Sequence, residues 1–454
     1  MNRFVVSLAV LALAGCSQDR DLPDPEVDCW TGLYQSAQGE FISVSPLSSG
    51  GYRWRRLDGQ TGRVEPEASV SLRGWTDEAD GLTLSLGACT DNAVQFGPSD
   101  APEPYRRVAL KITDTQFDAD GTQLAGRLVW PHNVDRAPVA IHVHGSESTS
   151  AILRYPMPYL LASQGIASFV YDKRGTGQSG DKYTQDFYLL ADDANAALDE
   201  VRRLAGDRID RVGYIGGSQG GWVAPLAASQ SDVDYVVALF GMAVNPLFED
   251  RSQVVGDLAR AGWDEEIQAK GAEIADAAGV IMASGFKTGY EEFDRLRDLY
   301  RDEAWYEDIV GEFTGEFLTA PSMGLRIVGP MMGITTSWDY EPVPVLRELD
   351  MPQFWMIAAD DREAPAEETI GRIHGLQAEG RPIDMAVYPN ADHGMVVIET
   401  GPDGEERNPG YVENYYNQVA AWILSGDLEL ALEAGAAVSG PMSPSSDALN
   451  SEPE

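Results

Sequence analysis

Between residues 139 and 388 the chain alternates between short, almost continuously apolar runs and longer helix-like stretches. Strands that are apolar on both faces are typical of a parallel sheet that helices cover on both sides. The alternation therefore predicts an α/β fold with a mostly parallel sheet. The apolar runs span residues 139–144, 166–171, 212–215, 235–240, 353–358 and 384–388. The helix candidates span residues 188–204, 222–229, 366–378 and 411–424.

The α/β region is expected to cover residues 106–428 and to contain one long insertion. At its start, an Asp120-Gly121 turn between two strand-like runs predicts a β-hairpin. Between about residues 245 and 340 the strand pattern disappears, and helix-like segments at 265–283 and 291–306 replace it. We therefore expect a helical lid in this interval.

The two ends of the chain differ from this region in sequence pattern and composition. Residues 28–105 contain short strand-like runs between Gly and Asp turns and no persistent helical period, which predicts a small β accessory domain. Residues 429–454 are rich in Ala, Ser, Pro and Glu, which predicts a disordered tail.

The first 15 residues have the pattern of an export signal. One Arg precedes an apolar run at residues 4–14, and eleven helical residues rise only about 16 Å, which is too short for a bilayer core of about 30 Å. The run ends in Leu13-Ala14-Gly15-Cys16, which resembles the lipobox of bacterial lipoprotein signals. The resemblance implies that residues 1–15 are removed, that Cys16 is acylated and that residues 16–27 form a tether. An ordinary signal with a chance Cys is the alternative.

This resemblance implies a protein in the bacterial cell envelope, most naturally on the outer membrane, facing the periplasm or the surface. Two or more acyl chains form a stable membrane anchor. Cys29 and Cys89 remain, and in an oxidising compartment two cysteines that flank one small module are expected to form a disulfide. Two buried free thiols are the alternative.

Composition excludes several classes of protein. Apolar residues make up 43% of the chain and charged residues 23%, which excludes disorder over most of the chain and a polytopic membrane protein. The 33 basic and 72 acidic residues leave a net charge of −39. Such a surface repels phosphate backbones, so we expect no binding of nucleic acid.

A candidate nucleophile lies between an apolar strand and a helix, in Gly216-x-Ser218-x-Gly220. A sharp strand–turn–helix holds such a Ser in a strained backbone and presents its Oγ at the start of the helix, and the glycines avoid collisions. The alternative is a purely structural Gly-rich turn in which the Ser only caps the helix.

A serine nucleophile needs a base and a group that orients the base. Of five histidines, His393 lies in a loop directly after the last predicted strand, where a base approaching the carboxyl edge of the sheet is expected. Asp360 and Asp361 follow the preceding strand, and either could be the acid.

Together these residues resemble the α/β-hydrolase superfamily, in which Ser, Asp and His follow in this order. More narrowly, the chain resembles the branch of esterases and peptidases related to prolyl oligopeptidases and serine aminopeptidases. The resemblance covers about residues 106–425. Its motifs are Asp118-Ala-Asp-Gly-Thr-Gln-Leu-Ala-Gly with Trp130-Pro131, His144-Gly145, Tyr171-Asp172-Lys-Arg174-Gly175-Thr-Gly177-Gln-Ser179, Gly216 to Gly220, Asp361-x-x-x-Pro365 and Asp392-His393-Gly394.

The resemblance implies roles for individual residues. The acid of the family usually stands four residues before the Pro, which favours Asp361 over Asp360. His144-Gly145 resembles the oxyanion loop of the family, which implies the backbone N–H groups of Ser146 and Gln219 as donors.

We expect no cofactor and no metal. Residues 175–180 spell G-x-G-x-x-G but neither follow their strand at once nor open a helix, as a dinucleotide-binding motif should. His142 and His144 lie two apart on one strand, yet the later Asp-His of a binuclear zinc site is missing.

The expected activity is that of a serine hydrolase that cleaves a carboxylic ester through an acyl-enzyme. Its expected partners are a small ester or short peptide as substrate, and the membrane through the lipid anchor. The first alternative is a serine peptidase of the aminopeptidase or acyl-peptide hydrolase type, which must hold a substrate amine with carboxylates such as Glu265-Glu266 or Glu291-Glu292. A non-catalytic binding lipoprotein on a hydrolase scaffold is the second.

Overall fold

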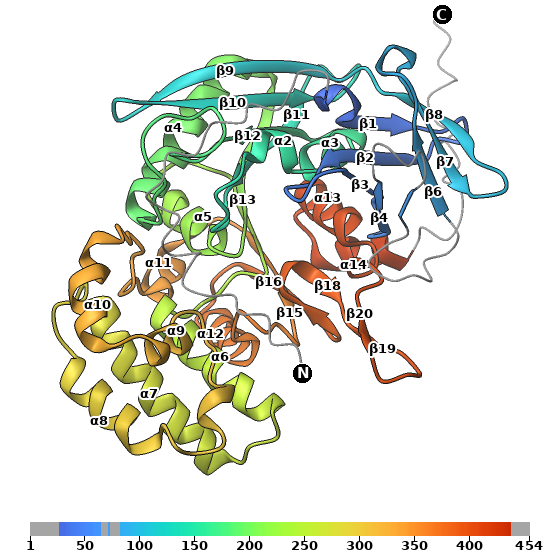
Figure 1. The fold of residues 1–454 in the computed structure, drawn as a ribbon. Coiled ribbons are helices and arrows are strands. Elements are labelled where there is room, and N and C mark those ends of the chain that lie inside the picture. Colours follow the sequence, from blue (N-terminus) through green and yellow to red (C-terminus); the bar gives the residue numbers. More distant parts are fainter. Residues whose placement is uncertain (1–26, 65–70, 73–81, 437–454) are drawn as a thin grey trace, which may run out of the picture.

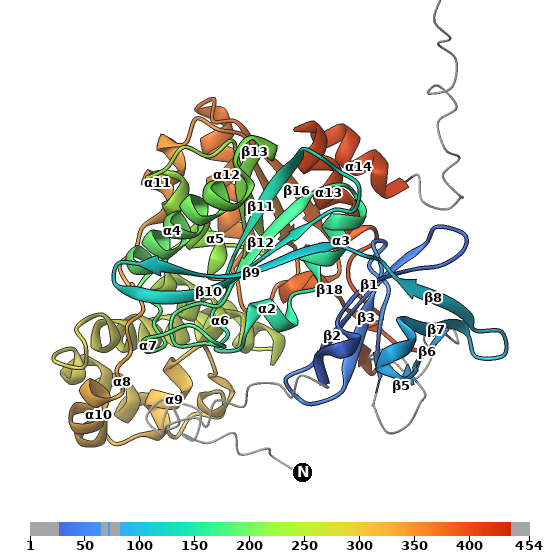
Figure 2. The same cartoon turned by 90° about the horizontal axis from the view of Figure 1, so that it is seen from above.

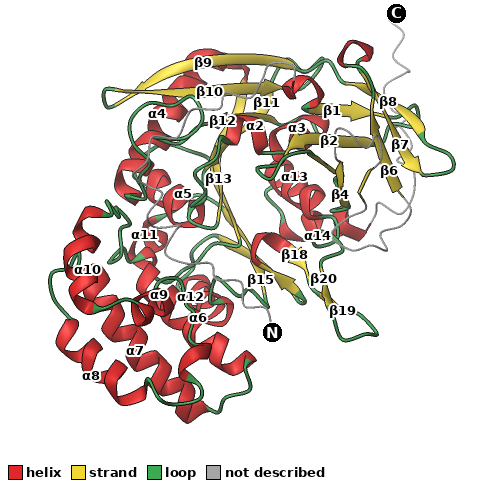
Figure 3. Ribbon diagram, viewed as in Figure 1, coloured by secondary structure: helices red, strands yellow, loops and turns green. Residues whose placement is uncertain are grey.

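A computed structural model describes residues 27–64, 71–72 and 82–436 of the chain. The signal, Cys16 and nearly all of the expected tether lie outside the described residues. Two eight-stranded sheets, two small two-stranded sheets and a set of helices make up the described part, which is coloured along the sequence in Figure 1 and by secondary structure in Figure 3.

The larger sheet has the strand order β16-β15-β14-β13-β11-β12-β10-β9. The six strands β11 to β16 run parallel, whereas β10 pairs antiparallel with both β12 and β9. The bounds are β9 (Lys111–Ala119), β10 (Thr122–Trp130), β11 (Ala137–Val143), β12 (Ala167–Tyr171), β13 (Ile209–Gly217), β14 (Tyr235–Leu239), β15 (Gln353–Ala358) and β16 (Ile383–Tyr388).

Helices cover both faces of this sheet. Along β11, Ile141 packs with the core on one face and Ala140 with the core on the other, which explains why the strands are apolar throughout. One core includes residues of α4 (Phe187–Ala205), α5 (Gly220–Ala228), α11 (Pro342–Glu348) and α12 (Ala366–Ala378). The other includes residues of α3 (Met157–Ser163), α13 (Tyr415–Ser425) and α14 (Leu428–Ala436). The predicted mostly parallel α/β sheet is confirmed.

Turn and cap residues account for several boundaries. The β9–β10 turn needs positive φ at both central positions, and Asp120 (φ 50°) and Gly121 (φ 79°) supply it. Helix α4 begins where the Asp186 side chain accepts from the N–H of Tyr188, and it ends at Gly206 (φ 54°).

The helical insertion begins with α6, whose first turn is capped by Asn245. Buried residues such as Ile274, Ile281 and Phe293 give the insertion a hydrophobic core of its own. In Figure 1 and Figure 2 these helices extend away from the sheet on the side opposite the N-terminal sheet. The helices are α6 (Pro246–Arg260), α7 (Glu265–Ala283), α8 (Tyr290–Tyr300), α9 (Thr314–Thr319) and α10 (Ser322–Val328).

The N-terminal β module is a single antiparallel sheet in the order β5-β4-β3-β2-β1-β8-β7-β6. Its outermost strands, β5 and β6, also contact each other, so the sheet curls around a core that includes Tyr34, Trp54 and Phe96. Its strands are β1 (Gly32–Gln35), β2 (Phe41–Pro46), β3 (Tyr52–Arg55), β4 (Thr61–Val64), β5 (Ser71–Leu72), β6 (Leu82–Leu86), β7 (Ala93–Pro98) and β8 (Glu103–Arg107).

The module is attached to the larger domain by backbone hydrogen bonds. The N–H groups of Tyr411, Asn414 and Asn417 donate to carbonyls of residues 57–59 over 2.8–3.2 Å. The loop between β3 and β4 therefore holds the segment that leads from the His393 loop into α13. Cys29 is disulfide-bonded, whereas the Cys89 side chain lies outside the described part, so the pairing of Cys29 with Cys89 stays a prediction.

The expectation of a disordered tail from residue 429 is wrong for its first residues. They form α14, where Asp427 Oδ1 accepts from the N–H of Leu430 at 3.1 Å and Ala431 is fully buried with the core around α13. Composition alone gave the wrong prediction because Leu428 and Ala431 pack against the core around α13, which composition does not reveal. Residues 437–454 lie outside the described chain.

Candidate active site

The three expected triad residues lie after the carboxyl ends of strands in the parallel sheet. Ser218 follows β13, Asp361 lies three residues after β15, and His393 lies five residues after β16. These strands are separated only by β14 in the strand order. Such an edge is where loops of open parallel sheets usually build sites.

Ser218 occupies a strained turn between β13 and α5. Its φ is +54°, a conformation that non-glycine residues seldom adopt. The turn is held by the N–H of Ser218, which donates to the Leu239 carbonyl at 3.1 Å, and by its carbonyl, which accepts from the Gly221 N–H at 2.7 Å. The surrounding structure thus stabilises the strained backbone of Ser218, whose side chain is half-buried.

The glycines of this turn are needed for space. A Cβ on Gly216 would lie 2.2 Å from the Gly220 carbonyl oxygen, and one on Gly220 would lie 2.7 Å from the Val143 oxygen. The motif therefore packs strand, turn and helix against the end of β11, as expected for a nucleophile elbow.

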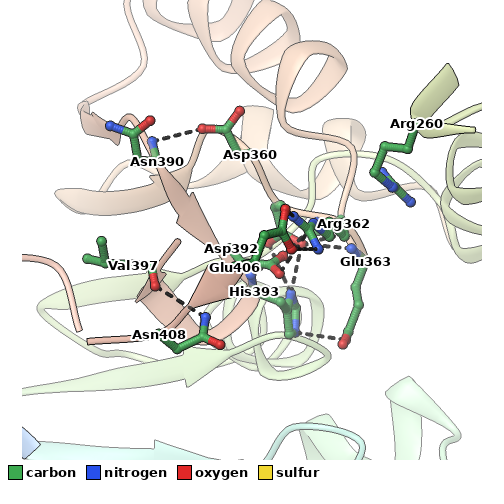
Figure 4. Close-up of polar contacts among 12 residues, drawn as sticks. Arg260, Asp360, Arg362, Glu363, Asn390, Asp392, His393, Val397, Glu406 and Asn408 are labelled. Carbon is green, nitrogen blue, oxygen red and sulfur yellow. Dashed lines mark hydrogen bonds and ion pairs between the residues drawn. The ribbon is translucent and has the colours of Figure 1, made fainter. Parts of the chain in front are cut away.

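His393 and Asp361 form a hydrogen-bonded pair. Nδ1 of His393 lies 3.0 Å from Oδ2 and 3.2 Å from Oδ1 of Asp361, and only 2% of the Asp361 side chain is exposed. Asp361 Oδ1 also accepts from the N–H of Ala364 at 2.8 Å. Asp360 is turned away: its carboxylate accepts from the Asn390 N–H at 2.8 Å (Figure 4). The hydrogen bonds thus show which of the two neighbouring acids pairs with His393: it is Asp361, as the family resemblance implied.

The surroundings favour the protonated form of His393. Burial alone would lower its pKa, but the hydrogen bond to Asp361 and the charges of Asp361, Glu363 and Asp392 outweigh burial and raise that pKa above its usual value. The ring also packs edge-on against Phe240, with the centroids 5.0 Å apart. Asp361 can thus fix the tautomer and stabilise an imidazolium.

Ser218 and His393 are not hydrogen-bonded to each other in this structure. Nε2 of His393 instead lies 3.5 Å from Oε2 of Glu363, whose side chain is 64% exposed (Figure 4). Catalytic hydrogen bonds are often long or absent before substrate binds. The hydrogen bond between His393 and Asp361 is therefore formed in this structure, whereas one between His393 and Ser218 is not.

Both expected oxyanion donors are free. Among the residues that the structure describes, none accepts a hydrogen bond from the backbone N–H of Ser146 or of Gln219. The two loops are also close, because a Cβ on Gly145 would lie 3.4 Å from the Gly217 carbonyl oxygen. Two unsatisfied N–H groups beside a serine can stabilise an oxyanion.

Several neighbours of His393 were not predicted as functional. Asp392 accepts from the N–H groups of His393 (2.8 Å) and Arg362 (2.9 Å), which joins the two loops. Glu363 comes from the loop of the acid, and Gln253 of α6 donates to its carbonyl at 2.8 Å. The available signal was position: Asp392 stands in the motif Asp392-His393-Gly394, and Glu363 is one of the unspecified residues of Asp361-x-x-x-Pro365.

The insertion also brings acidic groups toward this site. Burial raises the pKa of the Glu249 carboxyl well above its usual range, and the negative charges of Glu312, Glu363 and Asp361 add to the rise. Glu249 lies on α6, so the helical insertion brings a carboxyl group, held toward its neutral form, close enough to Asp361 and Glu363 to respond to their charges.

The two histidines on β11 have other surroundings. Burial lowers the pKa of His142 to about 3, and Nε2 of His144 accepts from the N–H of Lys173 at 3.0 Å. Within residues 27–64, 71–72 and 82–436, no group of three or more His, Cys, Asp or Glu side chains is arranged to hold a metal. The same ranges contain no helix whose length and hydropathy would suit a membrane span.

Comparison with known families assigns the fold. A model of the alpha/beta hydrolase family matches residues 140–404, more than half of the chain. The chain belongs to the alpha/beta hydrolase family. This hydrolase-family chain is also 32% identical over 136 residues to the uncharacterized protein YfhR of Salmonella typhimurium, which covers 29% of this chain and 42% of that protein. The chain thus matches less than half the length of this relative.

Solved structures include distant neighbours of this alpha/beta hydrolase. The Pyrococcus furiosus esterase Pf2001 is 16% identical and covers 63% of this chain and 82% of its own, with a TM-score of 0.39. The Pyrococcus horikoshii acylaminoacyl peptidase is 15% identical and covers 87% and 58%, with a TM-score of 0.44. Est1E from Butyrivibrio proteoclasticus is 15% identical and covers 71% and 99%, with a TM-score of 0.40.

Proposed function

We propose that this protein is a serine hydrolase that cleaves a carboxylic ester through an acyl-enzyme. Ser218 is the nucleophile, His393 is first base and then acid, and Asp361 orients the imidazole. The observation that carries the proposal is the pair of His393 and Asp361, 3.0 Å apart, at the sheet edge where Ser218 holds a strained φ of +54°. Family membership adds to it.

The reaction begins when Ser218 Oγ attacks the ester carbonyl and His393 Nε2 takes the hydroxyl proton. Negative charge then develops on the carbonyl oxygen, where the N–H groups of Ser146 and Gln219 can donate to it. The imidazolium returns the proton to the leaving alcohol, and water repeats the sequence on the acyl-enzyme. For the first transfer, Nε2 must exchange its position beside Glu363 for one beside Ser218.

A fluorophosphonate probe tests the mechanism. We expect labelling of Ser218 alone and complete inhibition of ester hydrolysis. Ser218→Ala and His393→Ala should each lower kcat by on the order of 10⁶-fold, and the double variant should lose little more, since the residues act as a unit. Ser229→Ala, at the other end of α5, is the matched control. Full ester hydrolysis by Ser218→Ala would mean that the mechanism is wrong.

One observation favours a serine peptidase as the second candidate. Oε2 of Glu363 lies 3.5 Å from Nε2 of His393, and the charge of Glu363 helps to raise the pKa of Glu249 and of Glu312 in the insertion. A group of carboxyls of this kind can bind the free amine of an aminoacyl substrate. The pairs suggested by the sequence are less suited, because Glu266 and Glu292 are exposed and bonded to Lys270 and Arg295. A substrate panel separates the two activities: esters should be hydrolysed fastest, whereas preference for amides with a free amine would favour the peptidase.

We also propose that the enzyme is anchored by lipid in the bacterial cell envelope. This rests on the lipobox-like Leu13-Ala14-Gly15-Cys16, which lies outside the described residues. The full-length protein should fractionate with membranes, and Cys16→Ser should release it into the soluble fraction. Unchanged partitioning of Cys16→Ser would exclude the anchor without touching the catalytic proposal.

A further inference from the structure

Lys173 is a buried cation behind the oxyanion loop. It lies two residues after β12, within the motif Asp172-Lys173-Arg174, and only 1% of it is exposed. Its Nζ donates to the Gly145 carbonyl oxygen at 2.8 Å. Burying an ammonium group costs free energy, so a lysine at such a buried position is expected to have a specific role.

The bond to Gly145 determines where the next N–H points. The carbonyl of Gly145 and the N–H of Ser146 belong to one planar trans peptide unit, in which C=O and N–H point in opposite directions. Because Lys173 holds the carbonyl on one side, the Ser146 N–H is directed to the other side. That N–H has no acceptor among the described residues.

Two tyrosines complete the support of this loop. The hydroxyl of Tyr183 donates to the Ser146 carbonyl oxygen, and the hydroxyl of Tyr155 accepts from the Gly145 N–H at 3.4 Å. Both neighbouring peptide units are therefore restrained. The tyrosines are neutral partners, so Lys173 is the one residue among these three that brings a positive charge to the loop.

We propose that Lys173 is a positioning residue that orients and polarises the Gly145–Ser146 peptide so that the Ser146 N–H can stabilise the oxyanion. The inference rests on the proposed serine hydrolase activity. A charged donor on the carbonyl makes a stronger hydrogen bond than a neutral donor, and bonds in a chain polarise one another. The charge of Lys173 thus makes the Ser146 N–H a better donor as well as fixing its direction.

The groups around Lys173 set the pH range in which it is charged. Burial lowers its pKa to about 8, and the negative charge of Glu147 opposes that decrease. The centroid of the Tyr183 ring lies 4.6 Å from Nζ. Oε1 of Glu147 accepts from the Tyr155 hydroxyl and lies 3.3 Å from Nδ1 of His144. Lys173 is therefore charged below about pH 8 and loses its charge as the pH rises through that value.

Kinetics of Lys173→Met test the proposal. The reference is the full chain acting on an ester without ionisable groups. We expect kcat to fall by about 10- to 100-fold, less than the 10²–10³-fold cost of losing an oxyanion donor outright, with KM nearly unchanged. The wild-type kcat should decrease above about pH 8, and this alkaline decrease should vanish in the variant. Lys182→Met, an exposed lysine of the same loop, should behave as wild type.

A wild-type kcat that stays flat past about pH 8, or a folded Lys173→Met with wild-type kcat, would overturn the role of Lys173. If Lys173→Met does not fold, Glu147→Gln gives the answer: without the Glu147 charge, the alkaline midpoint should move to lower pH, and an unmoved midpoint contradicts the proposal. Ser218→Ala distinguishes a failure of the serine hydrolase mechanism from a failure of the role of Lys173. If it is inactive while Lys173 proves irrelevant, only the positioning role is lost.

Discussion

Nε2 of His393 lies 3.5 Å from Oε2 of Glu363, so the ring nitrogen that accepts the Ser218 proton in the proposed mechanism faces a carboxylate. Glu363 is largely exposed, and its loop is bound by Gln253 of α6 in the helical insertion. The insertion therefore contacts the loop that carries both Asp361 and Glu363, and the charge of Glu363 acts directly on His393.

The first prediction concerns the pH dependence of catalysis. His393 is a base only when neutral, and its pKa is raised in part by Glu363. Activity therefore appears as the pH rises through that raised pKa. Glu363→Gln should lower the pKa and shift the acid limb of kcat/KM to lower pH. The control is Glu367→Gln, an exposed residue in the first turn of α12. An acid limb that stays in place or moves upward contradicts the role of Glu363.

The second prediction separates the neighbouring acids. Asp361→Asn should lower kcat by on the order of 10³- to 10⁴-fold, because the amide cannot stabilise the imidazolium. Asp360→Asn is the matched control: the Asp360 carboxylate accepts from the backbone N–H of Asn390 and not from His393, so this variant should lose far less. If Asp360→Asn were the more damaging, the assignment of the acid would be wrong, although the class of enzyme would survive.

The third prediction concerns a buried ion pair near the site. Arg174 bonds the Asp193 carboxylate at 2.7–2.9 Å, and the two side chains are 4% and 0% exposed. Asp193→Asn leaves a buried guanidinium with only the half-exposed carboxylate of Asp181, 3.4 Å away, as counter-charge, so the free energy of unfolding should fall by about 3–5 kcal/mol. Asp210→Asn, in the exposed pair with Arg136, should leave the denaturant midpoint nearly unchanged. Equal effects of the two variants would exclude a structural role for the buried pair.

The fourth prediction concerns the disulfide of Cys29. If its partner is Cys89, the bond closes a loop of about 60 residues and stabilises the protein by about 4 kcal/mol in the chain-entropy model. Alkylation without reductant should leave both thiols unmodified, and peptide mapping should find Cys29 and Cys89 in one linked fragment. Two alkylated thiols in the unreduced protein would refute the pairing.

Local sequence determined several helices and strands and the strained turn of the proposed nucleophile, Ser218. Helices at 265–283 and 366–378 and the strand at 353–358 have the bounds that their patterns predict, because periodicity and caps act over neighbouring residues. The glycines around Ser218 likewise mark the strained turn, since the need for space arises within five residues.

Tertiary structure decided which distant groups meet. Asp360 and Asp361 both follow the same strand, and only the family resemblance favoured Asp361; the structure shows that Asp361 is the one directed at His393, which follows another strand. Lys173 looked like an ordinary charged residue until the fold buried it against Gly145. The helix at 428–436 likewise depends on packing against α13 rather than on composition. Such contacts join residues far apart along the chain, and the geometry of the loops, which local periodicity does not encode, determines them.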